Sequence, residues 1–242
     1  MKEKKNHSIE KLFDKIIKSE KEVLGFIENP GTSGSNTSLT YFNQHCFNVY
    51  FKNDKYRKLI DDNFSVYPDG IGIYLSLRFL FRKKVQRIDA TQLNSLIIDK
   101  LIENKESVLI IGGKFNEPFL VKYLNKKGIN LAGYCHGFFG EQEAKDIIHK
   151  ASKAKYILIG MGVPGQEYFA DEIIKSLPGK TIICVGNFFE FYLGSIKRAP
   201  VIFQKLGIEW AFRLFTEPGR LWRRYILGIP EFLYRIIKAK FE

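Results

Sequence analysis

Asp69 is the acidic residue of this sequence that is best placed for chemistry. It follows a short apolar run, Ser65–Pro68, and precedes Gly70, so its carboxylate is expected at the end of a strand and at the edge of a cleft. A carboxylate there can act as a general base towards a hydroxyl nucleophile. Asp is also a common N-cap residue, and a helix is expected to begin near Ile71. From the residues alone the cap is the commoner of the two roles, and both stay open.

A second polar pair follows the glycine-containing turn of GMGVPGQE at 160–167. Gln166 and Glu167 would stand at the start of a helix, where the amide could hydrogen-bond a sugar or a pyrophosphate. The carboxylate could equally complement the helix dipole. The histidines are dispersed without metal-ligand spacing, no Asp-x-Asp motif occurs, and no nucleophilic triad can be assembled. We therefore expect no metal and no other cofactor.

The C-terminal segment, from about residue 205 onward, combines arginines with aromatic residues. Its arginines are Arg213, Arg220, Arg223 and Arg224. Apolar residues recur every three or four positions, as in Trp222 with Ile226 and in the stripe Phe232, Leu233, Ile236 and Ile237. This pattern is typical of an interfacial helix on an anionic membrane. The alternative, which periodicity alone favours, is a helix that packs its stripe on the domain. Helix breaks are expected at Pro218 and Pro230.

The elements that position these residues form a repeat of strand, glycine turn and helix. Apolar runs at 65–69, 108–113, 130–137, 156–162 and 181–186 alternate with helical patterns at 71–81, 91–103, 117–126, 141–153 and 166–176. Nearly continuous apolar strands suit a parallel sheet that is covered by helices on both faces. The sequence therefore predicts an α/β fold, a Rossmann-like, doubly wound and mostly parallel sheet.

Glycines stand at several of the predicted strand ends, where ligands bind in such sheets. Gly113 and Gly137 are candidates for contact with a phosphate, because glycine lets a ligand approach backbone N–H groups and helix N-termini. Ordinary turn chemistry explains any single glycine equally well.

Composition and charge indicate what kind of chain this is and what kind of partner to expect. The chain has 242 residues, 45% of them hydrophobic and 26% charged, which predicts a packed core and excludes a disordered or fibrous chain. Thirty-eight Lys and Arg against 26 Asp and Glu give a net charge of +12, so we expect an anionic partner. The three scattered cysteines indicate a reducing compartment. We find no apolar run of membrane-spanning length and no signal peptide, and we expect a cytoplasmic protein whose membrane contact is peripheral.

Four segments, in order, carry a resemblance to a known family. They are Pro68-Asp69-Gly70 with Gly72, GVPGQE (162–167), VGNFFEFYLGSIKRAP (185–200) and GIEWAFRLFTEPGRLWRRY (207–225). Over roughly residues 38–230 the chain resembles the WecG/TagA/CpsF family of bacterial glycosyltransferases. The resemblance implies inverting, metal-independent transfer of a sugar, often of N-acetylmannosamine type, from a UDP-sugar onto an undecaprenyl-diphosphate-linked sugar. It also implies a C-terminal appendage that docks on the inner face of the cell membrane and closes over the active site.

The resemblance assigns roles to single residues. It places a base on Asp69 and a conserved glutamine on Gln166, which are the two expected catalytic residues. It places the appendage arginines on Arg213, Arg220 and Arg223, with Arg224 beside them. A guanidinium fork suits pyrophosphate. The remaining candidates for substrate binding are Thr40, Asn43, Gly113, Gly137 and Glu167.

Three positions depart from the family pattern. The usual Thr-x-Asn reads Thr40-Tyr41-Phe42-Asn43, the segment 87–92 lacks the usual glycine and last acid, and Glu190 replaces an aspartate. The identity of the sugar therefore stays open.

The expected organisation is an N-terminal helical lead-in (1–24), an α/β glycosyltransferase core (25–200) and a helical appendage (201–242). The alternative function is a basic nucleic-acid-binding α/β module without catalysis, suggested by the net charge of +12. Clustering of the arginines in one tail beside Trp222 and Tyr225 favours a membrane over nucleic acid. An exposed apolar face on the tail could also serve a second copy of the chain, so a homo-oligomer stays possible.

Overall fold

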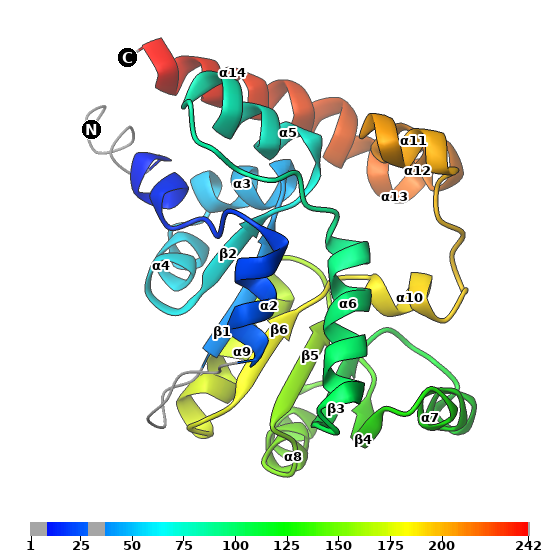
Figure 1. Ribbon diagram of the computed structural model, residues 1–242. Coiled ribbons are helices and arrows are strands. Elements are labelled where there is room, and N and C mark those ends of the chain that lie inside the picture. Colours follow the sequence, from blue (N-terminus) through cyan, green and yellow to red (C-terminus); the bar gives the residue numbers. More distant parts are fainter. Residues whose placement is uncertain (1–8, 29–36, 242) are drawn as a thin grey trace.

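Six parallel strands form one sheet in this computed structural model, which describes residues 9–28 and 37–241 (Figure 1). The strand order is β2-β1-β6-β5-β3-β4. The strands are β1 (Thr37–Phe42), β2 (Ser65–Pro68), β3 (Ser107–Gly112), β4 (Asn130–Cys135), β5 (Tyr156–Gly160) and β6 (Thr181–Cys184). Helices cover both faces, so the predicted doubly wound α/β fold is confirmed.

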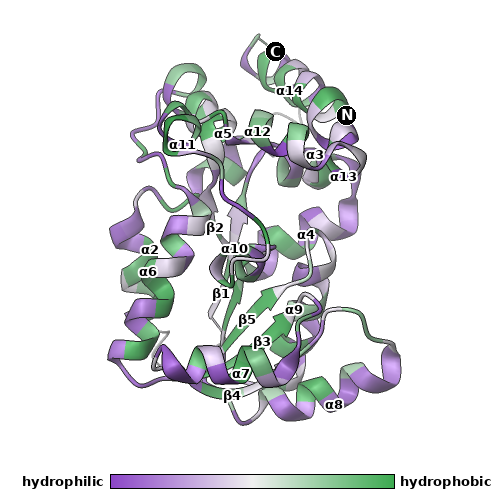
Figure 2. Cartoon of the chain, turned by 90° about the vertical axis from the view of Figure 1, so that its right-hand side faces the viewer, coloured by the Kyte–Doolittle hydropathy of each residue, from purple (hydrophilic) through white to green (hydrophobic). Residues whose placement is uncertain are grey.

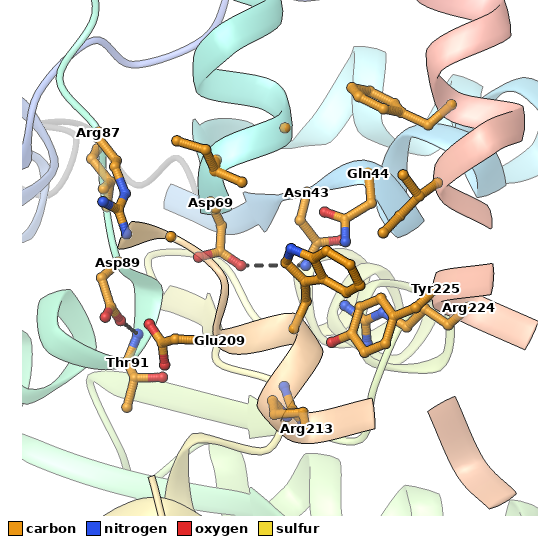
Figure 3. A pocket seen from close by; sticks show the side chains of 18 of the residues that line it. Asn43, Gln44, Asp69, Arg87, Asp89, Thr91, Glu209, Arg213, Arg224 and Tyr225 are labelled. Atoms are coloured by element: carbon orange, nitrogen blue, oxygen red, sulfur yellow. Dashed lines mark hydrogen bonds between the residues drawn. The ribbon is translucent and has the colours of Figure 1, made fainter. Parts of the chain in front are cut away.

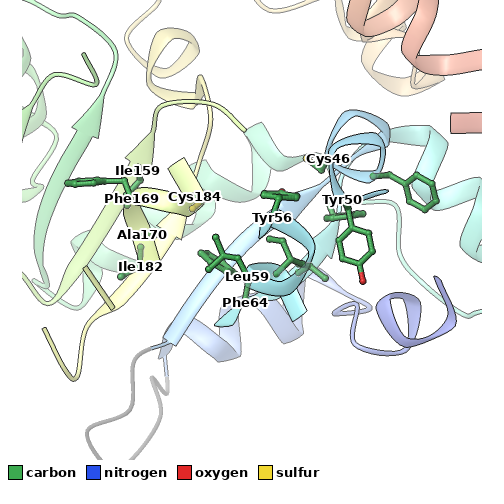
Figure 4. Close-up of a cluster of buried hydrophobic side chains, with 14 of the residues drawn as sticks. Cys46, Tyr50, Tyr56, Leu59, Phe64, Ile159, Phe169, Ala170, Ile182 and Cys184 are labelled. Carbon is green, nitrogen blue, oxygen red and sulfur yellow. The ribbon is translucent and has the colours of Figure 1, made fainter. Parts of the chain in front are cut away.

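The two faces of the sheet bury two separate apolar clusters. Along β3, Leu109 and Ile111 point into one cluster while Val108 and Ile110 point into the other, as the two-residue period of a strand requires. All four side chains are fully buried. Figure 4 shows part of the first cluster, in which residues of β5 and β6 meet side chains of α4 (Asp54–Asn63) and α9 (Gly165–Ser176).

The helices divide between these faces. The first face also carries α3 (Gln44–Lys52) and α8 (Glu141–Ala151). The second carries α2 (Glu20–Glu28), α6 (Ala90–Glu103), α7 (Glu117–Lys126) and α10 (Phe188–Tyr192). The four helices predicted between residues 91 and 176 are confirmed to within two residues at each end. The helix predicted at 71–81 is α5 (Gly70–Leu75), which continues into the wider π-helical turn η1 (Ser76–Leu80).

We predicted a helix over residues 1–24, but the described part of this lead-in is not one continuous helix. Residues 1–8 lie outside the described residues, residues 9–14 are helical, and α2 begins only at Glu20. The chain between them lies along β2, where the Ile17 N–H donates to the Val66 carbonyl at 2.8 Å. This pairing with the edge strand interrupts the helix. Leu12 and Phe13 are buried in the first cluster, so the lead-in packs on the domain.

The C-terminal segment folds into short helices followed by one long one. They are α11 (Val201–Leu206), α12 (Glu209–Thr216), α13 (Pro218–Trp222), the π-helical turn η2 (Arg223–Leu227) and α14 (Gly228–Phe241). The break at Pro218 is confirmed, since α13 begins there. The break expected at Pro230 is wrong. Pro230 falls in the first turn of α14, which follows the π-helical turn η2 without a gap, so the helical run that begins at Pro218 continues past Pro230 to Phe241.

The apolar stripe of α14 is divided between core and surface. Phe232 and Ile236 are buried, and Phe232 packs edge-on against Phe47 of α3 with ring centroids 5.1 Å apart. Leu233 and Ile237, which belong to the same sequence stripe, are exposed. In Figure 2 the ribbon of α14 carries both green apolar and purple hydrophilic segments. The packing expected of a C-terminal helix is therefore confirmed for half of the stripe only. Across the described residues, no helix is both long enough and apolar enough to span a bilayer.

Candidate active site

A cavity of about 230 Å³ lies beyond the carboxyl ends of β1 and β2, where the C-terminal helices meet the sheet (Figure 3). The sheet side contributes Asn43 and Asp69, and the segment between η1 and α6 contributes Asp89. The C-terminal helices contribute Arg213 and Arg224. The sheet and the C-terminal helices thus form this site together, in the place where open α/β sheets bind their ligands.

Asp69 stands in the N-cap position of α5, but its side chain does not cap that helix. Its Oδ2 accepts a hydrogen bond from Asn43 Nδ2 at 3.3 Å, and its Oδ1 accepts one from the backbone N–H of Ala90 at 3.1 Å. Ala90 is the first residue of α6, so the carboxylate lies at the N-terminus of a different helix. The carboxylate is held from two sides at the edge of the cavity, which is the position a base requires.

Asn43 is oriented by the helix that it starts. Its Oδ1 accepts from the backbone N–H groups of His45 and Cys46 at 3.0 and 3.2 Å and so caps α3. With the oxygen fixed in this way, the amide NH₂ must face Asp69. A cap at the end of β1 therefore sets the direction of a donor at the end of β2.

Burial raises the pKa of Asp69 above its ordinary value, and the nearby Asp89 acts in the same direction. The hydrogen bonds from Ala90 and Asn43, together with the charge of Arg224, lower this pKa and oppose the shift. A carboxylate with a raised pKa is a stronger base than an exposed aspartate.

Two arginines line the cavity. Arg213 lies over the ring of Phe191 at 5.3 Å, and Arg224 lies over the ring of Tyr225 at 5.7 Å. The Nε atoms of both arginines are buried and have no hydrogen-bond partner among the described residues. Two guanidinium groups in the lining of one cavity suit an anionic ligand.

Thr40, Gln166 and Glu167 form a buried network beneath the strand ends. Thr40 Oγ1 and Gln166 Nε2 both donate to Glu167 Oε1 at 2.8 Å. The Gln166 Oε1 accepts from the backbone N–H of Gly186 at 3.1 Å. Gln166 and Glu167 are fully buried, and burial raises the pKa of Glu167 to about 7. In this structure the Gln166 amide therefore holds the turn after β6 and does not line the cavity.

The appendage is joined to the segment 87–90 by a set of polar contacts that we call the latch. Arg87 Nη1 donates to the Lys205 carbonyl at 2.7 Å, and its Nη2 donates to the Gln204 carbonyl, both near the end of α11. Arg198 Nη2 donates to Asp89 Oδ2 at 2.6 Å. The Asp89 Oδ1 meanwhile caps α6 by accepting from the N–H groups of Thr91 and Gln92.

Glu209, the first residue of α12, adds a third carboxyl to this part of the cavity (Figure 3). Burial raises the pKa of Glu209 to about 7, with a further contribution from Asp89. Arg198 lies 3.8 Å from the Glu209 carboxylate and opposes the shift. Within the described residues, His, Cys, Asp and Glu form no group of three that could hold a metal ion.

Comparison with known proteins shows the family to which this chain belongs. The family model described as Glycosyl transferase WecG/TagA/CpsF family matches residues 12–242. This chain belongs to the WecG/TagA/CpsF family of glycosyl transferases. It is also similar to the N-acetylglucosaminyldiphosphoundecaprenol N-acetyl-beta-D-mannosaminyltransferase of Bacillus spizizenii. The two are 29% identical over 191 residues, which cover 77% of this chain and 73% of the relative.

The structure brings together some of the residues that the WecG/TagA/CpsF resemblance assigned, and separates others. Asp69, Asn43, Arg213 and Arg224 line one cavity. Arg220 and Arg223 do not line it: Arg220 Nε donates to Glu217 at 2.8 Å, and Arg223 lies over the exposed Trp222 ring at 5.2 Å.

Gly113 and Gly137 meet each other beyond the ends of β3 and β4, outside the lining of the Asp69 cavity. The Gly137 N–H donates to the Gly113 carbonyl at 3.0 Å. Close packing fixes the neighbouring strand ends, because a Cβ at Gly160 would stand 2.4 Å from the Gly186 carbonyl oxygen. The phosphate contact predicted for Gly113 and Gly137 therefore stays a prediction, and the Gly137 N–H is already used in this hydrogen bond.

Sequence reasoning missed two features that its own motifs contained. Gly160, Gly162 and Gly165 have the G-x-G-x-x-G spacing that often brings a phosphate to a helix N-terminus, and they join β5 to α9. Glu209 lies in the quoted GIEW segment, and Arg198 begins the quoted RAP segment. Neither residue could be given a role before the fold placed both beside Asp89.

Proposed function

We propose that this chain is an inverting glycosyltransferase that moves an N-acetylmannosamine-type sugar, or another hexose, from a UDP-sugar. The acceptor is a sugar linked to undecaprenyl diphosphate, and the product enters a bacterial surface polysaccharide such as a teichoic-acid-like polymer or a capsule. The name of the B. spizizenii relative supports both the acceptor and the transferred sugar. Family membership favours this function over nucleic-acid binding.

The catalytic role of Asp69 rests on its place at the cavity and its two fixed hydrogen bonds. Asp69 takes the proton from the acceptor hydroxyl while that oxygen attacks the anomeric carbon. The bond from that carbon to the UDP oxygen breaks on the opposite face, so the configuration inverts. General-base catalysis of this kind contributes about 10²–10⁴ in rate.

Charge on the departing diphosphate is met by Arg213 and Arg224. The lining of one cavity by these two arginines and by Asp69 is the single observation that carries the proposal, because base and cations then flank one space. Fixed donors aimed at developing charge need no reorganisation during the reaction. With the diphosphate held by guanidinium groups, we propose that the reaction proceeds without a metal ion.

The appendage brings the site to the inner face of the cell membrane. The outward side of α14 carries Leu233, Tyr234 and Ile237 next to Lys238 and Lys240, the composition of an interfacial helix. Deleting the chain from about residue 205 would also uncover the core beneath Phe232 and Ile236. Substitutions on the exposed side of α14 therefore test membrane docking more cleanly than a truncation.

The decisive experiment measures UDP release from a panel of UDP-sugars, with a short-chain prenyl-diphosphate-linked N-acetylglucosamine as acceptor. EDTA is present throughout. Acceptor-dependent release with one donor, abolished by Asp69→Asn, is the expected result. Release that requires added divalent metal would contradict the metal-independent mechanism. If no donor supports release, and the protein binds RNA tightly with strong salt dependence, the nucleic-acid alternative replaces this one.

A further inference from the structure

A second exposed segment has the composition of a membrane-contacting element, and it is far from the C-terminus in sequence. From Gly70 to Ile88 the chain carries five basic residues and no acidic one. Within it, Leu75 and Phe79 are 41% and 72% exposed. Arg78, Arg82 and Lys84 lie exposed around them. Large apolar side chains among cations, on the surface of a helix, are typical of contact with an anionic lipid surface.

This segment, α5 with η1, lies beside α14. A Cβ built on Gly72 of α5 would lie 3.4 Å from the ring of Phe232 of α14, so the two helices meet with little between them. Figures 1 and 2 show both helices at the same end of the molecule, away from α7 and α8. On α14, Tyr234, Ile237 and Phe241 are 64%, 51% and 82% exposed. The apolar and basic side chains of the two helices therefore project from one end.

The two helices also border the active-site cavity. Ile71 of α5 and Ile229, Phe232 and Leu233 of α14 line it on an apolar side, while Asp69 and Arg224 line it on a polar side. A molecule with a diphosphate head and a prenyl chain matches this division. Its diphosphate suits the Arg224 guanidinium, and the first carbons of its chain suit the apolar residues between the helices.

We propose that α5–η1 is a second bilayer-contacting element, and that a prenyl-diphosphate-linked acceptor enters the cavity between it and α14. The occupant of the α5–η1 face is an anionic lipid bilayer. The identity of the acceptor rests on the proposed function, but the contact of α5–η1 with lipid does not.

The geometry gives this second contact a purpose. One amphipathic helix on a bilayer leaves the protein free to rock on that single contact, whereas contact through two neighbouring helices fixes the direction of the cavity between them. Because α5 begins directly after Asp69, the element that contacts lipid is continuous with the residue proposed as base.

The first test measures co-sedimentation of the full-length protein with vesicles of phosphatidylcholine, with and without phosphatidylglycerol. The variant Leu75→Ser/Phe79→Ser should bind the anionic vesicles at least about tenfold more weakly, since both side chains lose their apolar contact. Arg78→Gln/Arg82→Gln should lose about fivefold in affinity per charge on the anionic vesicles, and little on pure phosphatidylcholine.

Matched controls come from α7, at the other end of the molecule. Lys126→Gln/Lys127→Gln removes the same charge, and Phe119→Ser removes a ring that is 59% exposed. Both should bind vesicles as the wild type does. Equal losses of vesicle affinity in the α7 and the η1 variants would mean that only net charge or exposed apolar area matters, and would overturn the proposal. Unchanged vesicle binding by the η1 variants would also overturn it. Circular dichroism checks that each variant is folded.

A second measurement reports on position and does not depend on affinity. The three native cysteines are buried, so a Phe79→Cys variant can be labelled there with an environment-sensitive fluorophore. Its emission should shift to shorter wavelength on anionic vesicles, and a lipid-borne quencher should reduce it. A label at Phe119→Cys should do neither. A label at Phe79→Cys that stays in water while the protein is bound would refute contact of η1 with the bilayer.

The two proposals fail separately. Turnover of a water-soluble acceptor by the wild type tests the transferase function and involves no vesicle. If that turnover is found but the η1 variants bind membranes normally, the second contact is wrong and the function stands. If the wild type transfers no sugar but η1 enters the bilayer, the lipid contact stands and the acceptor assignment falls.

Discussion

Asn43 Nδ2 and Asp69 Oδ2 lie 3.3 Å apart, although the two residues end different strands and are separated by 26 positions. The register of β1 and β2 brings them together, since Phe42 pairs with Pro68 and the next residue of each strand follows at the same edge. Family membership and this contact point to the same carboxylate. The relationship also yields the two sharpest tests of its role.

Removal of the base should reduce catalysis and leave the fold intact. Asp69→Asn keeps the size of the side chain, so kcat should fall by about two to four orders of magnitude with little change in the melting temperature. In the wild type, kcat/KM should fall at low pH around a pKa above the ordinary value for aspartate, because burial raises the pKa of Asp69. Steady-state UDP release as a function of pH measures both. Full activity in the variant would leave Asp69 with a purely structural role.

A change at Asn43 should move that pH dependence. Asn43→Asp keeps an oxygen to cap α3 but replaces the NH₂ donor with a second carboxylate beside Asp69. Like charges this close raise the pKa of one carboxyl, so activity should be lost at a higher pH than in the wild type. The shift should be about one unit or more. Asn43→Ser, which retains a cap but removes the NH₂ donor without adding a charge, is the control: loss of that hydrogen bond should raise the pKa of Asp69 by less than the added carboxylate does.

The cavity arginines should matter for anion binding. Arg213→Gln and Arg224→Gln each remove a guanidinium whose Nε has no partner among the described residues. Charge-assisted hydrogen bonds of this kind contribute about 1.5–3 kcal/mol, so the affinity for UDP should fall by about ten- to a hundredfold. Calorimetric titration with UDP measures it. Arg57→Gln, on the surface of α4 where Arg57 pairs with Asp54, is the matched control and should bind UDP normally. Unchanged UDP affinity in both cavity variants would mean that these arginines serve the acceptor diphosphate or neither.

Glu167 should make stability depend on pH. Its pKa rises from 4.5 in the unfolded chain to about 7 in the fold, because of burial. The folded state therefore holds a proton that the unfolded state releases. The stability from this group is fully present below about pH 4.5 and is lost as pH rises through about 7. The loss is of the order of 3 kcal/mol.

Glu167→Gln imitates the protonated form and should remove this dependence. Urea unfolding at pH 5 and pH 8 should give a smaller difference in the free energy of unfolding for the variant than for the wild type. Glu209, whose pKa also rises to about 7, titrates in the same window in both proteins and cancels in the comparison. If the difference in the free energy of unfolding between the two pH values is the same in both proteins, the proton taken up on folding is not bound by Glu167.

The sequence predicted the parts of the fold where local pattern and tertiary packing agree. Strands such as β3 are apolar on both faces, and α6 and α7 begin at Asp89 and Asn116, whose side chains cap them. It could not predict the break after residue 14, because that break depends on pairing of Ile17 with Val66 from another part of the chain. It also could not divide the α14 stripe, since the position of α3 decides which side is buried.

The sequence predicted which residues belong to the candidate site better than it predicted how they are arranged. Asp69, Asn43, Arg213 and Arg224 share a cavity as the motifs suggested. The burial of Gln166 could not be predicted, because its amide bonds to Gly186 on a neighbouring strand end. The contribution of Asp89 was hidden for the same reason, since its partner Arg198 lies 109 positions along the chain.

The latch joins the appendage and the proposed base through four consecutive residues. Arg87 and Asp89 bond to the appendage side, and the next residue, Ala90, donates its N–H to Asp69. Displacement of the appendage would therefore release the strand of chain that fixes one oxygen of the carboxylate. By thermodynamic reciprocity, any interaction that stabilises the position of the appendage also stabilises the orientation of the Asp69 carboxylate. A molecule whose C-terminal helices are displaced would then lose its reactivity, and the nucleotide-sugar in the surrounding solution would be spared from hydrolysis.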